Sequence, residues 1–352
     1  MANVIGRIKN LVGKIRDRLK LLPKKFITRD PVIISPYRGY ASKNRIYMKG
    51  RVLEDENIFT GEKERISRNL INTFKRFETD EIAHADVVIN CKGQSFKCKT
   101  DTEGYFTLDE YWEAPLKKSE NHWLEVNLVS SQGDHNGHGE IIAKGEVLLP
   151  SENADYGVIT DIDDTILQTH VTSPFRLRML YVTFMKSALK RLPVEGMAEI
   201  FQQFVRGSDG AKENPIFYIS HSPWNIYDLL KAFLGYQNFP KGPILLRDYG
   251  WKPSGHYAHH KISSIAHILK TYPHLPFILL GDSAEEDTDF YIQTAKTFPN
   301  RIKAIYIRQT RNNKNAQRIK KLIEENADVN VVLIHSSKEI SRHALENGLI
   351  PE

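Results

Sequence analysis

The strongest constraint on the fold is a regular alternation in the second half of the chain, where short β-branched apolar runs are separated by helix-like intervals. Parallel strands need long crossover connections, so this alternation is typical of a parallel sheet with helices on both faces. We therefore predict an α/β, doubly wound parallel sheet, whose ligands lie beyond the carboxyl ends of the strands. The six predicted strands cover residues 157–160, 216–220, 244–247, 277–281, 302–307 and 329–334.

Residues 30–150 follow a different pattern, in which short segments alternate apolar and polar side chains. Alternation with a period of two predicts strands with one buried face, and several such strands in series favour a β-sandwich domain. A helical pattern at 66–77 interrupts the series as an insertion. Polar and turn-forming residues after Leu149 predict a linker, so we expect a smaller β-sandwich domain at 30–150 and the α/β domain at 151–352.

The net charge is concentrated at the N-terminal end. Residues 1–29 carry nine Lys or Arg against one acid, a net of +8 in a chain whose total is +6, so the remainder is about −2. We therefore expect no nucleic-acid partner. Apolar residues spaced three and four apart predict an amphipathic helix that binds an anionic membrane surface through residues 1–22. A helix docked on the protein body and a targeting peptide remain alternatives.

Two further features concern the compartment. The sequence contains no run of 18 apolar residues and no pattern of a secretory signal, so we expect a cytoplasmic protein with peripheral membrane contact. Its two cysteines, Cys91 and Cys98, are too few for a disulfide framework or a zinc site, and we expect free thiols.

Three carboxylates follow the first parallel strand within four positions, in the sequence Asp161-Ile162-Asp163-Asp164-Thr165. Without a counter-charge these groups would repel one another. A divalent cation removes that repulsion, and carboxylate oxygens are ligands that suit Mg²⁺. The alternative is a polar turn in which Asp164 or Thr165 caps the next helix, but it explains only one of these residues.

The Asp-x-Asp-x-Thr motif resembles the phosphotransferases of the haloacid dehalogenase superfamily, and three further motifs follow in that superfamily's order. A serine ends the second strand, a lysine stands before a predicted helix at 262–270, and Gly281-Asp282 is followed by an aspartate five positions on. The resemblance implies a haloacid dehalogenase-like, Rossmann-like domain. It also implies phosphate binding by Ser220 and Lys261, and Mg²⁺ ligation by Asp161, Asp163, Asp282 and Asp287, with Asp287 orienting a metal-bound water or the lysine.

More particular stretches at 157–166, 222–224 and 241–243 look like the actin patch protein family of Mg²⁺-dependent phosphatidate phosphatases. In that family a β-rich segment precedes the catalytic domain, and the resemblance covers roughly residues 45–310. It implies hydrolysis of phosphatidate to diacylglycerol and phosphate at a membrane surface.

The residue types permit a specific chemistry. Asp161 is expected to attack phosphorus and form an aspartyl phosphate, while Asp163 protonates the leaving oxygen and later deprotonates water. The backbone carbonyl of Asp163 is also an expected metal ligand. Ser220 and Lys261 are expected to donate hydrogen bonds to the phosphoryl oxygens, and Thr165 to orient the loop.

Two other functions fit the same sequence. One is a phosphatase of the same chemistry that acts on a soluble phosphomonoester or a nucleic-acid end. The other is a lipid-binding or scaffold protein with a vestigial site. Four residues near the predicted site, His256, His259, His260 and Arg247, receive no role from the sequence.

Overall fold

The computed structural model describes residues 31–54, 81–116, 122–131, 139–162, 166, 194–248, 257–283, 286–309 and 316–351, with the side chains of 257–259 left aside. The amphipathic helix predicted within residues 1–22 and the helical insertion predicted at 66–77 lie outside these residues.

The second half of the chain forms a six-stranded sheet in which every neighbouring pair is parallel, as the alternation predicts. The strand order β11-β10-β9-β12-β13-β14 places the first strand of this domain in the middle. The strands are β9 (Gly157–Asp161), β10 (Ile216–Pro223), β11 (Ile244–Arg247), β12 (Phe277–Asp282), β13 (Ile302–Arg308) and β14 (Val331–Ile334).

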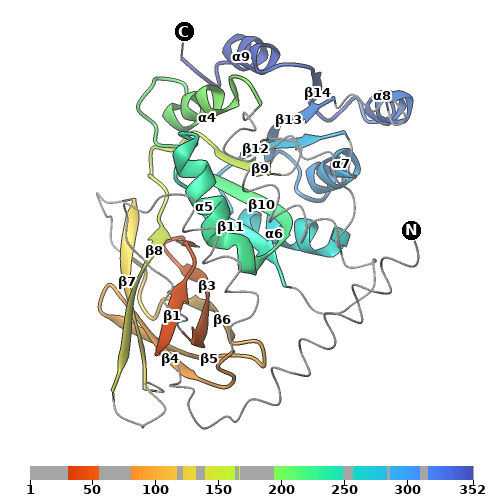
Figure 1. Ribbon diagram of the computed structural model, residues 1–352. Coiled ribbons are helices and arrows are strands. Elements are labelled where there is room, and N and C mark those ends of the chain that lie inside the picture. The colour runs from red at the N-terminus through yellow and green to blue at the C-terminus, as the bar shows by residue number, and fades with distance from the viewer. Residues whose placement is uncertain are drawn as a thin grey trace, which may run out of the picture.

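Helices cover both faces of this sheet (Figure 1). On β9, Val158 packs into a core shared with α4 (Met197–Arg206), α5 (Tyr227–Tyr236) and α9 (Ser337–Glu346). The next residue, Ile159, packs on the opposite face against α6 (Tyr257–Thr271) and α7 (Asp287–Thr297). Every residue of β9 is buried, because a parallel strand covered on both faces has no solvent side.

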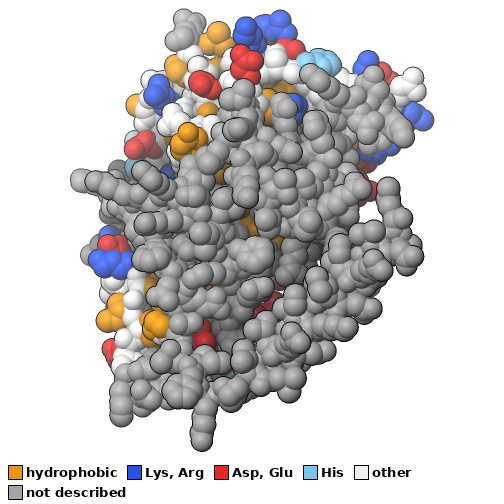
Figure 2. Space-filling model, viewed as in Figure 1, with side chains coloured by type: hydrophobic (Ala, Val, Ile, Leu, Met, Phe, Trp, Pro, Cys, Tyr) orange, Lys and Arg blue, Asp and Glu red, His pale blue; other side chains and the backbone are white. Residues whose placement is uncertain are grey.

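The remaining helix, α8 (Ala316–Glu324), follows β13 and carries part of a basic tract. Its Arg318 forms two hydrogen bonds of 2.9 Å to the carboxylate of Asp289 on α7. Figure 2 shows cationic and anionic side chains intermixed at the end of the molecule that α8 and α9 form. The described part of this tract is therefore a solvated helix surface with acidic neighbours.

The first half forms a mixed eight-stranded sheet in the order β1-β3-β2-β8-β7-β4-β5, with β6 paired to β3. All its pairs are antiparallel except β2 with β8. One apolar core collects side chains from strands at both ends of this order, so the sheet curls around a single interior. The strands are β1 (Val32–Pro36), β2 (Gly39–Ala41), β3 (Arg45–Glu54), β4 (Asp86–Cys91), β5 (Gln94–Lys99), β6 (Tyr105–Tyr111), β7 (Trp123–Ser130) and β8 (Ile141–Leu148).

The two cysteines agree with the sequence-based expectation of free thiols. Cys91 and Cys98 are free thiols, and burial raises their pKa values to about 11 and about 12. Such groups stay protonated at neutral pH and are poor nucleophiles.

Among the described residues, no helix combines the length and the apolar content needed to cross a membrane.

The eight-stranded sheet lies against the parallel sheet (Figure 1). Ring packing, a hydrogen bond and an ion pair join the two. The ring of Tyr40 on β2 meets Phe217 of β10 edge-on, with 5.5 Å between ring centroids. The hydroxyl of Tyr272 donates to the carbonyl of Ala41 at 3.1 Å. At another point, Glu146 of β8 pairs with Lys241, which lies just before β11. The eight-stranded sheet is therefore in direct contact with the strands that carry the predicted site.

Candidate active site

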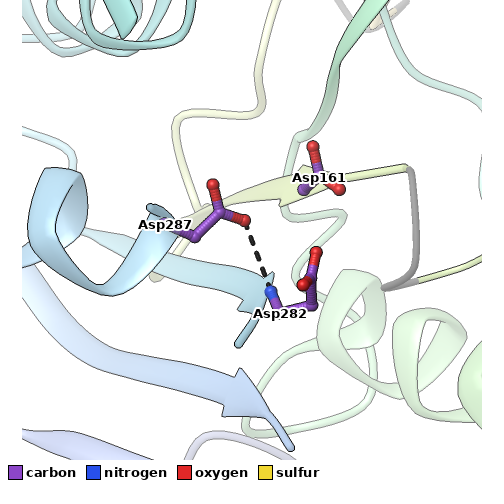
Figure 3. A group of neighbouring side chains, drawn as sticks. All are labelled: Asp161, Asp282 and Asp287. Carbon is purple, nitrogen blue, oxygen red and sulfur yellow. Dashed lines mark hydrogen bonds between the residues drawn. The ribbon is translucent and has the colours of Figure 1, made fainter. Parts of the chain in front are cut away.

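Three aspartates meet at the carboxyl edge of the parallel sheet (Figure 3). Asp161 is the last residue of β9, Asp282 the last of the neighbouring β12, and Asp287 the first of α7. Because Thr160 pairs with Leu280 in the parallel register, the ends of the two central strands lie side by side. All three side chains have no solvent exposure, which concentrates their negative charge in a buried space.

The carboxylates are close enough to share one cation. One oxygen from each of Asp161, Asp282 and Asp287 lies within 4.8 Å of the others. Figure 3 shows the three carboxylates gathered at the ends of β9 and β12, with that of Asp282 pointing toward Asp161. Hard oxygen donors of this kind are the ligands that Mg²⁺ and Ca²⁺ take in proteins. The donor set therefore fits a divalent cation.

A buried lysine balances part of this charge. Lys261 has no solvent exposure; its ammonium lies 2.9 Å from Asp161 Oδ1 and also contacts Asp287 Oδ1. Among these four side chains, three carboxylates and one ammonium leave two negative charges. Buried uncompensated charge is costly, and a single divalent cation would neutralise this excess. The charge balance thus agrees with the donor geometry.

The structure places Lys261 differently from the sequence-based expectation in one respect. The sequence predicts a helix that begins after the lysine, at 262, whereas α6 already begins at Tyr257. Lys261 is therefore inside the helix, one turn from its start. Ile265, Ile268 and Leu269 of the same helix pack into the core beneath the sheet, which holds the ammonium rigidly toward the carboxylates.

Gly281 is a residue of the site whose importance sequence reasoning missed. The backbone N–H of Asp282 donates to Asp287 Oδ2 at 3.3 Å, a contact drawn in Figure 3. A Cβ on Gly281 would lie 2.4 Å from that same oxygen and 2.8 Å from the ring of Tyr291. The tight approach of α7 to β12 therefore requires glycine here. The Gly-Asp pair in the sequence was the available signal.

Ser220 lies at the edge of the same site on β10, the other neighbour of β9. Ile219 pairs with Asp161, so Ser220 stands one residue beyond the end of β9. Its side chain is fully buried, and its hydroxyl oxygen accepts a hydrogen bond from the backbone N–H of Ser222 at 2.9 Å. The predicted phosphate-binding serine and lysine thus come from the strand and the helix that flank Asp161.

Several predicted residues receive no structural account. The predicted site residues Asp163 and Thr165 lie outside the described residues. The same holds for His256 and for the side chain of His259, to which the sequence assigns no role. His260 is described: burial and the neighbouring His221 lower its pKa from 6.5 to about 4. It is therefore neutral at physiological pH.

The described geometry suits nucleophilic chemistry on a phosphoryl group. Asp161 has a carboxylate fixed by strand β9 and an ammonium beside it, so the approach of a second anion is electrostatically less unfavourable. A cation between Asp161 and Asp282 would lower that repulsion further. Ser220 and Lys261 add donors on either side. This combination is typical of enzymes that transfer phosphoryl groups through an aspartate.

Comparisons with known proteins identify relatives of this chain. Residues 156–309 match the family model of the catalytic domain of phosphatidate phosphatase APP1. The phosphatidate phosphatase APP1 of Saccharomyces cerevisiae is 32% identical over 245 residues, which cover 66% of this chain and 39% of the relative. The uncharacterized protein C29B5.04c of Schizosaccharomyces pombe is 27% identical over 220 residues, 60% of this chain and 34% of that protein.

This chain therefore spans well under half the length of these two relatives. Among solved structures, a carbohydrate acetylesterase from Xanthomonas citri is similar over 76% of this chain and 66% of its own, at 10% identity. The TM-score of that likeness is 0.26, and it carries no argument about fold or function.

Proposed function

Because residues 156–309 match the family model of the phosphatidate phosphatase APP1 catalytic domain, we propose that this chain hydrolyses phosphatidate to diacylglycerol and phosphate. The family resemblance expected from the motifs agrees with this match. The geometry of the site supports the chemistry that we propose for Asp161, Ser220, Lys261, Asp282 and Asp287. The roles proposed for Asp163 and Thr165 rest on the sequence motif alone.

The observation that carries the proposal is the buried cluster of Asp161, Asp282, Asp287 and Lys261. All four residues, and Ser220 with them, fall within the segment that matches the catalytic family. A vestigial site would have little reason to keep three buried carboxylates and a buried ammonium together, since such a group is costly without a ligand.

For the fold, we propose a haloacid dehalogenase-like, doubly wound domain at 151–352 and a β-sandwich domain at 30–150. The central position of β9 and the helices on both sheet faces support the first assignment. The single apolar core inside the curled eight-stranded sheet supports the second. The proposed boundary at 150 falls between β8 and β9, where the chain passes from one sheet to the other.

In the proposed first step, a carboxylate oxygen of Asp161 attacks phosphorus and the bond from phosphorus to the ester oxygen breaks. Lys261, at 2.9 Å from Asp161 Oδ1, holds the carboxylate in place and offers positive charge to the phosphoryl oxygens. Asp287 fixes the lysine from its other side, which keeps the ammonium oriented.

Proton transfer is assigned to Asp163, two positions after the nucleophile. It would protonate the leaving alkoxide, then take a proton from the water that attacks the aspartyl phosphate, which frees inorganic phosphate and restores Asp161. Ser220 would donate to a phosphoryl oxygen, and Thr165 would orient the loop that carries Asp163.

The proposed cofactor is Mg²⁺, held by Asp161, Asp282 and the backbone carbonyl of Asp163, with Asp287 beside it. When bound, the cation supplies positive charge that offsets repulsion between the carboxylate and the phosphate ester. The fit rests on three buried carboxylates whose oxygens lie within 4.8 Å.

We further propose a cytoplasmic enzyme that meets its substrate at an anionic membrane surface through residues 1–22, without a nucleic-acid partner. Nine cationic residues within 1–29 support this placement, since each cation near lipid headgroups contributes about 1 kcal/mol. Removal of residues 1–29 should lower activity on anionic phosphatidate vesicles and leave activity on a soluble phosphomonoester unchanged. Equal vesicle rates before and after the truncation would rule out this role.

The test of the proposed function is phosphate release from phosphatidate in mixed micelles, beside a panel of soluble phosphomonoesters, with and without Mg²⁺. Wild type and Asp161→Asn are compared, because the amide keeps the side-chain size and removes the nucleophile. Phosphatidate should be the best substrate, with no turnover by the variant. Faster release from soluble esters would refute the lipid substrate, and no release from any ester would favour a scaffold protein.

A further inference from the structure

The pairing of β10 with β11 is irregular around Ser220. The pairing of β10 with β11 shifts between Ile219 and Pro223, so the strand end that carries Ser220 has no regular ladder on that side. The backbone N–H of Ser222 holds the Ser220 hydroxyl at 2.9 Å. A shift of Ser222 would therefore pull on the Ser220 hydroxyl through this hydrogen bond.

Aromatic packing from the eight-stranded sheet fixes the residues immediately beyond. β10 ends at Pro223 and continues into a single turn of 3₁₀ helix, η2 (Trp224–Ile226), and then α5. The ring of Tyr37, which follows β1, stacks on Trp224 with 4.7 Å between centroids and 9° between planes. The same ring lies 4.4 Å from Tyr227. Tyr37, Trp224 and Tyr227 are all buried.

Two hydrogen bonds between the sheets reinforce this packing. The hydroxyl of Tyr105 on β6 donates to Asn225 Oδ1 at 2.7 Å. The backbone N–H of Arg38 donates to the hydroxyl of Tyr227, also at 2.7 Å. The first bond joins the eight-stranded sheet to η2 and the second joins it to the first residue of α5, so the chain after Pro223 is held by polar as well as apolar contacts.

A buried lysine completes the arrangement. Lys49 of β3 is 8% exposed, and its ammonium lies 5.4 Å from the ring centroid of Tyr105 and 5.3 Å from that of Trp224. It also pairs with Asp248, the residue after β11. The ends of β10 and β11 are thus both attached to the same face of the eight-stranded sheet. We call Tyr37, Lys49 and Tyr105 the clamp.

We propose that the clamp positions Ser220, so that the eight-stranded sheet completes the phosphate-binding edge of the site. Only Pro223 separates Trp224 from Ser222, and its ring restricts the backbone, so a displaced Trp224 would carry Ser222 and the Ser220 hydroxyl with it. A donor must stand 2.7 to 3.1 Å from its phosphoryl oxygen to be effective. This inference rests on the proposed function in taking Ser220 as a phosphate donor.

The test compares wild type with four variants in the presence of Mg²⁺, by calorimetric binding of inorganic phosphate and by kcat and KM for p-nitrophenyl phosphate. Tyr37→Leu removes the stacked ring, Tyr37→Phe keeps it, and Tyr105→Phe removes one hydroxyl. Tyr272→Phe is the matched control: it removes a hydroxyl at the same interface, 3.1 Å from Ala41 O. Tyr272 directly follows α6, and at 1.5 Å per helical residue it lies about 16 Å from Lys261 along the helix axis.

We expect Tyr37→Leu to weaken phosphate binding and lower kcat by about tenfold or more, because misplacement by 1 Å can cost about 10²-fold. Tyr105→Phe should lower both by a few-fold, on the order of one lost hydrogen bond. Tyr37→Phe and Tyr272→Phe should match wild type within about twofold, since neither displaces the stacked ring. If the leucine variant does not fold, Tyr105→Phe tests the same clamp.

The inference is overturned if folded Tyr37→Leu and Tyr105→Phe bind phosphate and turn over as wild type does, or if Tyr272→Phe is impaired equally. Failure of the proposed function would give a different result in these assays. Wild type would then bind inorganic phosphate but leave phosphatidate intact, and the binding data would still decide whether the clamp positions Ser220.

Discussion

Replacing Gly281 by alanine should displace the Asp287 carboxylate and so weaken the proposed cation site, although no carboxylate of the site is itself substituted. The added Cβ would lie 2.4 Å from Asp287 Oδ2 and 3.0 Å from Asp287 Cβ. That carboxylate is held from two sides, by the backbone N–H of Asp282 and by Lys261, so it cannot move without breaking a contact. Overpacking of a buried site typically costs about 1 to 3 kcal/mol of stability.

The effect on cation binding follows from the same displacement. Disturbing a group that supports metal ligands commonly weakens metal affinity by about 10- to 100-fold. Isothermal titration of Mg²⁺ into Gly281→Ala and wild type measures this change, and thermal unfolding with and without Mg²⁺ measures the stability.

Gly235→Ala is the matched control for this experiment. Gly235 lies in α5, and no atom lies within 4 Å of where its Cβ would be. Alanine should therefore stabilise the protein by about 0.5 to 1 kcal/mol through helix propensity and leave Mg²⁺ binding unchanged. Equal Mg²⁺ affinity in Gly281→Ala and Gly235→Ala would refute the argument that Asp287 supports the cation site.

Three further predictions concern charged groups. Folding lowers the pKa of His260 from 6.5 to about 4, so between pH 6.5 and pH 4 the unfolded chain binds more protons than the folded protein. The free energy of unfolding should therefore fall by at most about 3 kcal/mol as the pH is lowered from 6.5 to 4. Urea unfolding of His260→Gln should lack that dependence. Lys261→Met should lose about 3 to 5 kcal/mol at pH 7, because buried carboxylates lose their partner, and Mg²⁺ should restore part of this in thermal unfolding. Arg318→Ala, at an exposed pair, should cost under about 1 kcal/mol in the same assay.

The sequence predicts the parallel sheet well because its strands are buried on both faces. The apolar runs at 157–160 and 277–281 stand out between polar intervals, and the structure extends each by only one residue, to Asp161 and Asp282. The short strands β1 and β2 are harder to predict from alternation. β2 has only three residues, and it is buried because it packs against the other sheet, where Tyr40 contacts Phe217.

The residues of the candidate site were predictable from the sequence because their motifs follow the predicted strands at a recognisable spacing. Asp161, Lys261, Asp282 and Asp287 are brought together by the topology that the alternation predicts. The clamp was not predictable, because Tyr37 and Trp224 lie far apart in the sequence and the motif at 222–224, which contains Trp224, gives no sign of its partner. Their stacking depends on how two separate sheets pack, which no local periodicity records.

The most direct test of the central claim is to trap the aspartyl phosphate. A ³²P-labelled phosphomonoester is mixed with the Mg²⁺-loaded protein, quenched in acid, and the labelled peptide is identified by mass spectrometry. Asp163→Asn is included, with a phenyl ester whose leaving group needs no acid, because loss of the base for the second step should then let the intermediate accumulate. We expect a hydroxylamine-sensitive label on Asp161 and none in Asp161→Asn. A label on another residue, or turnover by Asp161→Asn at the wild-type rate, would contradict it.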